Sequence, residues 1–247
     1  MIGLFLIGAA SLIVLKIVVD STVFGSELRA ALDRDPAAKN PLKIMFLYPG
    51  FRALKSHRTA HALHRLKVPF VPDLLSQWTR RVTGIEIHPA AVIGRGLFID
   101  HGMGVVIGET TVIGDQVTLF QGVTLGGNGK ECGKRHPTLG NRIVIGAGAK
   151  VLGNITIGDD VFIGANAVVV RDVPSDCTVV GVPGRIANLE GQKVPAVPLD
   201  HMHLPDPIAK ALQKLQEEIE TIEREIHDRR GGGPPKDRSG DHDPPRS

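Results

Sequence analysis

The amino-acid sequence predicts a mainly β fold, a parallel β-helix with a helical cap before it and one further helix after it. Three observations carry this prediction. Between Ile87 and Pro174 an aliphatic residue returns every six positions, the period of a coil built from three short strands. Only 4% of the residues are aromatic, which suits a coil filled by aliphatic and small side chains. The repeat is broken once, by a polar and glycine-rich stretch.

The repeat predicts which residues fill the coil. A period of six fits neither the turn of an α-helix nor the alternation of a single strand, so each aliphatic position marks one short strand. The lead aliphatic residues are Ile87, Ile93, Ile99, Val105, Ile107, Ile113, Leu119, Leu125, Ile145, Val151, Ile157, Ile163 and Val169. Four residues after most of them comes a second small or apolar position, such as Leu97 or Met103. A two-residue shift separates Val105 from Ile107, where the repeat restarts.

Length, charge and cysteine content limit the class of protein. The 247 residues are enough for one sizeable domain with appendages, or for two small domains. A net charge of +3, without a basic patch that carries aromatic residues, gives no reason to expect a nucleic-acid partner. Cys132 and Cys177 form neither a disulfide framework nor a paired metal-ligand spacing. We therefore expect a reducing compartment and no metal.

Residues 1–20 form an apolar segment. The run from Ile2 to Val19 carries one charge, Lys16, and is just long enough for a membrane span. A buried helix, or a helix in contact with another subunit, explains the same pattern, so both interpretations stay open. Because lysine and arginine follow the segment and none precede it, we expect the rest of the chain in the cytoplasm. If residues 2–19 span a membrane, they tether the chain to its inner face.

Residues 21–83 predict a helical cap that covers the open end of the first coil. Ser26 begins a helix, and Asn40-Pro41 marks a break between helices. Residues 42–66 carry apolar side chains at three- and four-residue spacings, as in a helix that lies on another surface. Residues 72–81 can form a last short helix. The β-helix domain then occupies residues 84–187, with a loop at residues 127–138.

The C-terminal part of the chain predicts a linker at residues 188–205, a helix at 206–230 and a disordered tail at 231–247, where glycine, proline and charge replace apolar residues. The helix has a heptad seam made of Ile208, Leu212, Leu215, Ile219, Ile222 and Ile226. Isoleucine at both seam positions favours three or more associated helices. Packing of the helix on its own subunit is the alternative.

Two places in the repeat carry side chains suited to chemistry. Asp100 and His101 directly follow Ile99, so both should point out of the coil, and an imidazole on a face shared with a neighbouring subunit can act as a general base. Glu86 lies fifteen residues earlier, close to one coil away, where it can orient such a base. On the residues alone, an outward histidine is more often a plain surface or interface residue.

The second place is the loop at residues 127–138. It holds four polar or charged residues and three glycines before Arg135 and has no aliphatic side chain, so it cannot line the coil interior. A tolerated surface insertion explains such a loop, and so does a functional loop on a rigid scaffold. Arg135 and His136 within it favour the functional interpretation.

Taken together, the motifs resemble the serine O-acetyltransferases of bacterial cysteine biosynthesis. The resemblance covers residues 33–186 and rests on the runs IEIHPAAVIGRGLFIDHGMGVVIGE, QGVTLGGNGK, GKRHP, IGAGAKVLGNITIG and GVPGRI. Hexapeptide repeats are shared by many acyltransferases, whereas Asp100-His101 combined with Arg135-His136 is specific to this family. The resemblance implies a left-handed coil, a homotrimer, and transfer of an acetyl group from acetyl-CoA to the hydroxyl of L-serine.

The resemblance also implies roles for individual residues. His101 corresponds to the general base that takes the hydroxyl proton, with Glu86 as its carboxylate partner where some relatives have aspartate. Asp35 and Asp100 correspond to the carboxylates that hold the ammonium group of serine. A zwitterionic substrate needs charges of both signs around it, because a buried unpaired charge is costly.

Arg135 and His136 correspond to the pair that receives the carboxylate of serine. Acetyl-CoA is expected in the groove between adjacent β-helices, where small residues allow its pantetheine arm to approach the backbone. These small residues are Gly126, Gly127, Ala147 and Ala165.

Two departures from the family pattern bear on the partners. Longer members have a large N-terminal helical region that pairs two trimers, and this chain has only the final portion of it, so we expect a trimer. Some members bind the next enzyme of the pathway through a C-terminal isoleucine, whereas this chain ends Pro-Arg-Ser, which puts that complex in doubt. The alternatives to serine acetylation are acetylation of a sugar or another alcohol, and a non-catalytic β-helix scaffold.

Overall fold

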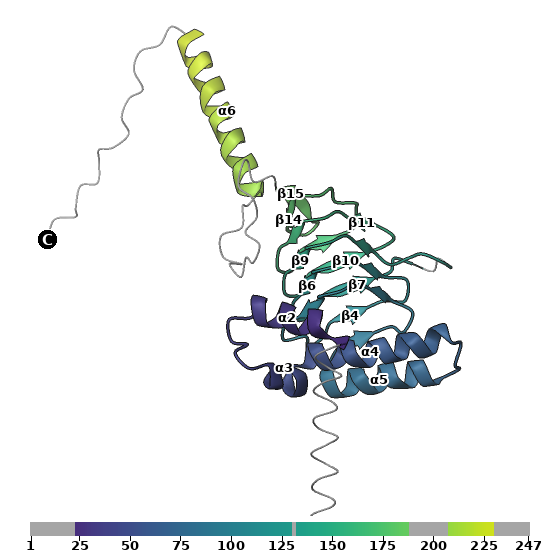
Figure 1. The fold of residues 1–247 in the computed structure, drawn as a ribbon. Coiled ribbons are helices and arrows are strands. Elements are labelled where there is room, and N and C mark those ends of the chain that lie inside the picture. The colour runs from purple at the N-terminus through teal and green to yellow at the C-terminus, as the bar shows by residue number, and fades with distance from the viewer. Residues whose placement is uncertain (1–22, 130–131, 188–206, 230–247) are drawn as a thin grey trace, which may run out of the picture. The chain divides into compact units, whose positions relative to one another are not determined.

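The computed structural model describes residues 23–129, 132–187 and 207–229 (Figure 1). The predicted apolar segment, the linker at 188–205 and the tail at 231–247 lie outside these ranges. The chain divides into two compact units, one up to Pro205 and one from Asp206 onward. The first unit contains four described helices, α2 (Gly25–Arg34), α3 (Pro41–Leu47), α4 (Pro49–Arg65) and α5 (Val71–Thr83).

The rest of the first unit is a parallel β-helix. Its strands are β1 (Glu86–Ile87), β2 (Val92–Ile93), β3 (Phe98–Ile99), β4 (Val106–Ile107), β5 (Val112–Ile113), β6 (Thr118–Leu119), β7 (Thr124–Gly126), β8 (Thr138–Leu139), β9 (Val144–Ile145), β10 (Lys150–Leu152), β11 (Thr156–Ile157), β12 (Phe162–Ile163), β13 (Val168–Val169), β14 (Thr178–Val180) and β15 (Arg185–Ala187). Figure 1 shows them stacked in successive coils. All described strand pairs are parallel except β14 with β15, which is antiparallel and ends the stack.

Successive strands belong to three sheets in turn. Sheet A has the order β1-β4-β7-β10-β13, sheet B the order β11-β8-β5-β2, and sheet C the order β15-β14-β12-β9-β6-β3. Each coil therefore turns three corners. We call them the A–B corner, between a sheet A strand and the following sheet B strand, the B–C corner, and the C–A corner. Side chains at one corner stack along the coil axis, whereas different corners are separated by the width of a sheet.

Strand pairing shows where the coil departs from a strict repeat. Val106 pairs with Thr124, which sets the regular coil, whereas the first coil, from Glu86 to Val106, is two residues longer. The coil from Thr124 to Lys150 is eight residues longer because the loop between β7 and β8 leaves the stack there. Both irregularities were expected from the spacing of the aliphatic residues.

The core confirms the predicted interior. Every lead aliphatic residue named from the sequence is buried in one continuous cluster that runs along the coil. Met103 differs from the other second positions in being exposed, at 67%. The reason is the longer first coil: Val105 takes the interior position, and the two extra residues push Met103 outward. This second position is therefore turned outward, unlike Leu97 in the same coil.

The helices close one end of the coil, as the sequence predicts. Ala53 and Leu54 of α4 join the same apolar cluster as the first coil, which removes the end of the β-helix from water. The backbone of α4 lies so close to β3 that a Cβ on Gly50 would stand 2.2 Å from the carbonyl oxygen of Ile99. Only glycine fits at this contact.

Proline and asparagine residues set the helix boundaries in the cap. The Asn40 side chain accepts a hydrogen bond of 2.9 Å from the N–H of Leu42 and caps α3, with Pro41 at its first position. The stretch 42–66, predicted as one helical segment, is divided at Tyr48. Pro49 begins α4 and disfavours helical backbone in the residue before it, so Tyr48 is extended.

Arg34 fastens the end of α2 to the wall of the β-helix. Its Nη1 donates to the carbonyl oxygens of Gly96 and Val117, at 3.3 and 3.2 Å, and to the hydroxyl of Thr118 at 3.0 Å. Three acceptors from neighbouring coils are thus held by one guanidinium. Asp35, the next residue, takes its position from this anchor.

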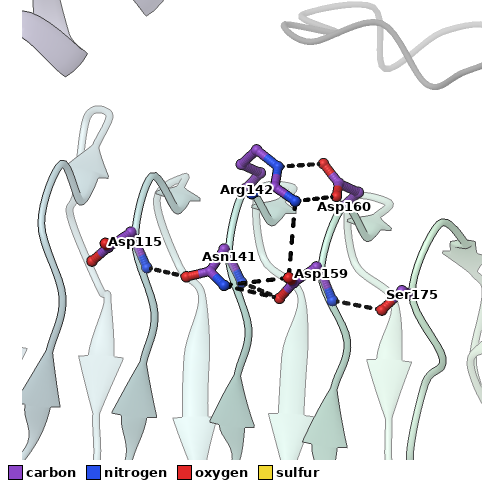
Figure 2. Close-up of polar contacts among 6 residues, drawn as sticks. All are labelled: Asp115, Asn141, Arg142, Asp159, Asp160 and Ser175. Carbon is purple, nitrogen blue, oxygen red and sulfur yellow. Dashed lines mark hydrogen bonds and ion pairs between the residues drawn. The ribbon is translucent and has the colours of Figure 1, made fainter.

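The B–C corner carries a ladder of polar side chains (Figure 2). Each member accepts a hydrogen bond from a backbone N–H of the preceding coil. Arg95 N–H donates to Asp115, Asp115 N–H to Asn141, Asn141 N–H to Asp159 and Asp159 N–H to Ser175, at 2.7 to 3.0 Å. Beside the ladder, Arg142 makes a bidentate contact with Asp160. The turns of this corner are therefore joined by side chains as well as by strand pairing.

The second compact unit contains α6 (Pro207–Arg229). The seam residues whose side chains are described, Leu215, Ile219, Ile222 and Ile226, are all exposed. The heptad spacing therefore gives this helix an apolar stripe that water reaches.

The predicted localisation needs correction. Across residues 23–129, 132–187 and 207–229, no helix is both long enough and apolar enough to cross a membrane. Residues 2–19, on which the membrane tether was predicted, lie outside the described residues. The tether is therefore withdrawn.

Candidate active site

One group of predicted site residues gathers where α2 and β3 end. Asp35 follows α2 in extended backbone. Its Oδ2 accepts a hydrogen bond of 2.7 Å from the Tyr48 hydroxyl, and its Oδ1 accepts one of 2.8 Å from the N–H of Ala37. Asp100 follows β3 and is half-buried. Its pKa is raised mainly by burial, with nearby His101 opposing the rise and nearby Asp35 adding to it.

Tyr48 holds Asp35 in place. The hydrogen bond to Asp35 is the main cause that raises the pKa of Tyr48 to about 12, with burial and the charges of Asp35 and Asp100 adding to it. Tyr48 therefore keeps its proton and stays a donor at neutral pH. Asp35 and Asp100 thus place two carboxyl groups near each other, an arrangement in which a cation is favoured.

His101 lies in the turn that the two-residue shift lengthens. The turn between β3 and β4 has six residues, 100–105, whereas the equivalent turn between β6 and β7 has four, 120–123. His101 is exposed, with a φ of 57°. Histidine tolerates this left-handed conformation better than most residues. The imidazole is thus presented on the outside of the C–A corner, beside Asp100.

Glu86, the predicted partner of His101, contacts a different residue. Its Oε2 lies 3.3 Å from Nε of Arg80, which is in the last turn of α5. Glu86 is the first residue of β1 in sheet A and pairs with Val106. In this chain, the carboxylate is therefore held by the helical cap, and its orientation of His101 stays a prediction.

A second group surrounds the base of the loop. The side chain of Arg135 forms an ion pair with Glu109, and this hydrogen bond is the main cause that lowers the pKa of the Glu109 carboxyl. Lys134 Nζ donates to the carbonyl oxygen of Thr110 at 2.6 Å. His136 is 8% exposed, and burial is the first cause that lowers its pKa, followed by the positive charge of Arg135.

The two groups occupy different corners. Asp100 and His101 lie at the C–A corner, whereas Arg135 and His136 lie in the loop at the A–B corner. Each group has its own charged neighbours: Asp35 and His101 act on Asp100, while Arg135, Glu109, Lys134 and His88 act on His136. The structure of one chain therefore brings the predicted residues together within each group but does not join the two groups.

The four small residues predicted to contact CoA divide in the same way. Gly126 ends β7, and Gly127 follows it at the A–B corner. Ala147 and Ala165 lie in consecutive turns of the C–A corner, where the carbonyl oxygen of Ala147 accepts a hydrogen bond of 2.8 Å from the residue after Ala165. Both corners thus carry small residues at these positions, and at the A–B corner the side chains of Leu152 and Arg135 lie beside Gly126 and Gly127. Among the described residues, no group of three or more His, Cys, Asp or Glu side chains could hold a metal ion.

The chain resembles characterised proteins along most of its length. Residues 136–171 match the family model "Bacterial transferase hexapeptide (six repeats)". The serine acetyltransferase of Synechococcus elongatus is 56% identical over 201 residues, which cover 81% of this chain and 82% of the relative. The chain belongs to the serine acetyltransferase family. The Bacillus subtilis serine acetyltransferase is 52% identical over 204 residues, covering 83% and 94% of the two chains.

A solved structure agrees with this assignment. The Neisseria gonorrhoeae serine acetyltransferase, in complex with serine, superposes with a TM-score of 0.65 at 43% identity, covering 67% of this chain and 68% of that one. Membership of the serine acetyltransferase family identifies the coil as a left-handed β-helix, which confirms the predicted fold class.

Sequence reasoning missed three residues that shape the two groups in this serine acetyltransferase. They are Tyr48, which holds Asp35, and the pair Glu109 and Thr110, which hold the base of the loop. The hexad pattern marks Glu109 and Thr110 as turn residues, and nothing in their spacing connects them with a loop 25 residues later. Tyr48 precedes Pro49, and its extended backbone was a readable signal that its side chain leaves the helix.

Proposed function

We propose that this chain transfers the acetyl group of acetyl-CoA to the hydroxyl of L-serine, giving O-acetyl-L-serine and free CoA, the first step of cysteine biosynthesis. The observation that carries the proposal is that the chain holds both an acidic group, Asp35 and Asp100, and a separate group that offers Arg135 and His136. An amino acid carries one ammonium and one carboxylate, and these two groups offer a partner for each.

His101 acts as the general base in this proposal. The hydroxyl of serine is a weak nucleophile and needs a base within hydrogen-bond reach. A ring nitrogen of His101 takes the hydroxyl proton while the oxygen attacks the thioester carbon. The tetrahedral intermediate then expels the CoA thiolate, and the imidazolium passes the serine proton to this sulfur, which gives free CoA and neutral His101. The atoms balance without a metal or an oxidant.

The charged residues orient serine for this step. Asp35 and Asp100 hold the ammonium at the C–A corner, next to His101, while Arg135 and His136 hold the carboxylate. Two fixed ends leave the hydroxyl little freedom, and such positioning accounts for a large share of catalysis in two-substrate reactions. Glu86 is proposed to orient His101 once substrate is bound, which would require the carboxylate to leave Arg80.

The separation of the two groups supports a homotrimer. A C–A corner of one chain and an A–B corner of its neighbour can face each other around a threefold axis, which would complete the serine site between chains. The same contact would bring Gly126 and Gly127 of one chain opposite Ala147 and Ala165 of the next, and acetyl-CoA would lie along that groove. The exposed seam of α6 is proposed to assist the assembly.

Purified protein tests the proposal. Release of the CoA thiol is followed with acetyl-CoA and either L-serine or a panel of sugars and amino alcohols. We expect activity with L-serine that depends on both the amine and the carboxylate, so serine methyl ester and ethanolamine should be poor substrates. Activity on sugars alone would refute the proposal.

His101→Ala tests the mechanism. The variant should keep the oligomeric mass of the unaltered protein and lose kcat by about a hundredfold or more, because general-base catalysis contributes on that order. The matched control is His64→Gln, an exposed histidine of α4 outside both groups. A His101→Ala enzyme with nearly unchanged kcat would show that another group takes the proton.

A further inference from the structure

The turn after β4 supports the base of the loop. We call it the GET turn, made of Gly108, Glu109 and Thr110. The backbone N–H groups of Arg135 and His136 each donate to the hydroxyl oxygen of Thr110, both at 3.1 Å. A single side chain from the preceding coil therefore fixes two consecutive residues at the end of the loop between β7 and β8.

Thr110 also determines which nitrogen of His136 carries the proton. The backbone N–H of Thr110 lies 3.2 Å from Nδ1 of His136, and the Thr110 hydroxyl lies 2.9 Å from the same atom. A backbone N–H can only donate, so Nδ1 must offer its lone pair. The hydroxyl oxygen already accepts two N–H groups and has one proton left to donate, which it gives to Nδ1. The ring proton is then on Nε2.

Gly108 keeps the ring in this orientation. A Cβ on Gly108 would lie 2.0 Å from Cδ2 and 2.2 Å from Nε2 of His136, so the imidazole packs directly over the glycine backbone. Nε2 has no hydrogen-bond partner within the described part of the chain, and it is not one of the fully buried polar atoms. One face of the ring is thus fixed, and one N–H is left for a ligand.

We propose that the GET turn holds His136 as the neutral Nε2–H tautomer, so that the loop presents one charged donor, Arg135, and one neutral donor to the carboxylate of the substrate. This inference rests on the proposed function for the identity of the ligand. A protonated ring would place an N–H on Nδ1 against the N–H of Thr110, so charging His136 would break both contacts.

The surrounding charges agree with a neutral ring. The groups that act on His136 are Arg135, Lys134 and His88, which disfavour its protonation, and Glu109, which favours it. Glu109 is already engaged by Arg135. Because His136 adds no charge, carboxylate recognition at this corner depends on the direction of its hydrogen bonds more than on net charge, which favours a planar carboxylate over a spherical anion.

Thr110→Val and Thr110→Ser test the role of the hydroxyl. Valine has the shape of threonine without the hydroxyl, and serine retains the hydroxyl. Thr110→Val loses the contacts of the hydroxyl with the loop backbone and with Nδ1 of His136, which should raise the KM for L-serine about tenfold. The KM for acetyl-CoA should be unchanged, and kcat should stay within about threefold of the value for the unaltered protein. Thr110→Ser should restore most of the affinity. An unchanged serine KM in Thr110→Val would overturn the inference. Equal circular dichroism spectra and acetyl-CoA KM values show that the variant is folded.

Ring nitrogen shifts test the tautomer without any catalysis. With ¹⁵N-histidine, the signals of His136 are identified by their absence from His136→Gln. They should show an unprotonated Nδ1 and a protonated Nε2 from pH 8 down to pH 6, in contrast to an exposed histidine, which charges in this range. A ring that charges above pH 6, or that carries its proton on Nδ1, would overturn the inference. Failure of the proposed function would appear separately, as unaltered protein that does not acetylate L-serine.

Discussion

His57 makes the stability of this chain depend on pH in a way that a mutation can remove. It lies in α4 with 4% of its surface exposed, and neither ring nitrogen makes a hydrogen bond of normal geometry. Burial, followed by nearby His61 and Arg58, lowers its pKa from 6.5 to about 3, and a weak backbone contact at Ala91 offsets only part of this. The folded chain therefore keeps His57 neutral where the unfolded chain protonates it.

The sign and size of the effect follow from linkage. The folded pKa is the lower one, so the stability is present above pH 6.5 and is lost as pH falls towards 3. The slope is about 1.4 kcal/mol per pH unit within that window. Between pH 7.5 and pH 5, His57 alone should reduce the free energy of unfolding by about 2 kcal/mol.

Urea unfolding at several pH values, at one protein concentration, measures this loss. In His57→Leu, about 2 kcal/mol of the decrease between pH 7.5 and pH 5 should disappear, because the unfolded state no longer gains the proton. His64→Gln, in the same helix but exposed, should retain the full decrease. If unaltered protein and His57→Leu lost stability in parallel over this range, the reasoning from burial would be refuted.

Three further predictions concern the site and the ladder. Gly108→Ala places a Cβ where the His136 ring lies, so it should raise the KM for L-serine at least tenfold in steady-state kinetics while the KM for acetyl-CoA stays the same; equal serine KM values would contradict the packing. Tyr48→Phe removes the donor to the predicted ammonium ligand Asp35 and should raise the serine KM by about tenfold. If the affinity for serine measured by calorimetry were unchanged in this variant, the prediction would be disproved. Asn141→Ala removes one rung of the ladder and should lower the free energy of unfolding by about 1 kcal/mol in urea; an unshifted midpoint would mean that water replaces the rung without loss.

The interior of the fold was predictable because its physics is periodic. An aliphatic side chain every six residues has one place to go in a three-strand coil, and every lead position is buried. The pattern was less informative where the period changes. Val105, a lead aliphatic residue, is buried as predicted, but the spacing does not show that the second-position residue Met103 turns outward.

The site was predictable only in part, because its residues are recognised by motif and positioned by contacts that no motif contains. Asp100, His101, Arg135 and His136 were named from the sequence, but not the corners that separate them. The ion pair between Glu86 and Arg80 depends on how α5 meets β1, and the hold of Thr110 on His136 depends on the exit of the loop from the stack. Such contacts join residues far apart in the chain, where local sequence carries no signal.

The polar ladder at the B–C corner has a consequence for engineering. Its side chains already accept backbone N–H groups from the preceding coil, so this corner of the β-helix needs no neighbouring chain to satisfy them. The A–B and C–A corners carry the residues assigned to substrate, and in the proposed trimer they face adjoining chains. The B–C corner is then the free outer surface of each subunit. A dye, a surface linker or a fused peptide attached at the exposed Arg95 would therefore lie on the B–C corner, apart from the two corners that carry the proposed site.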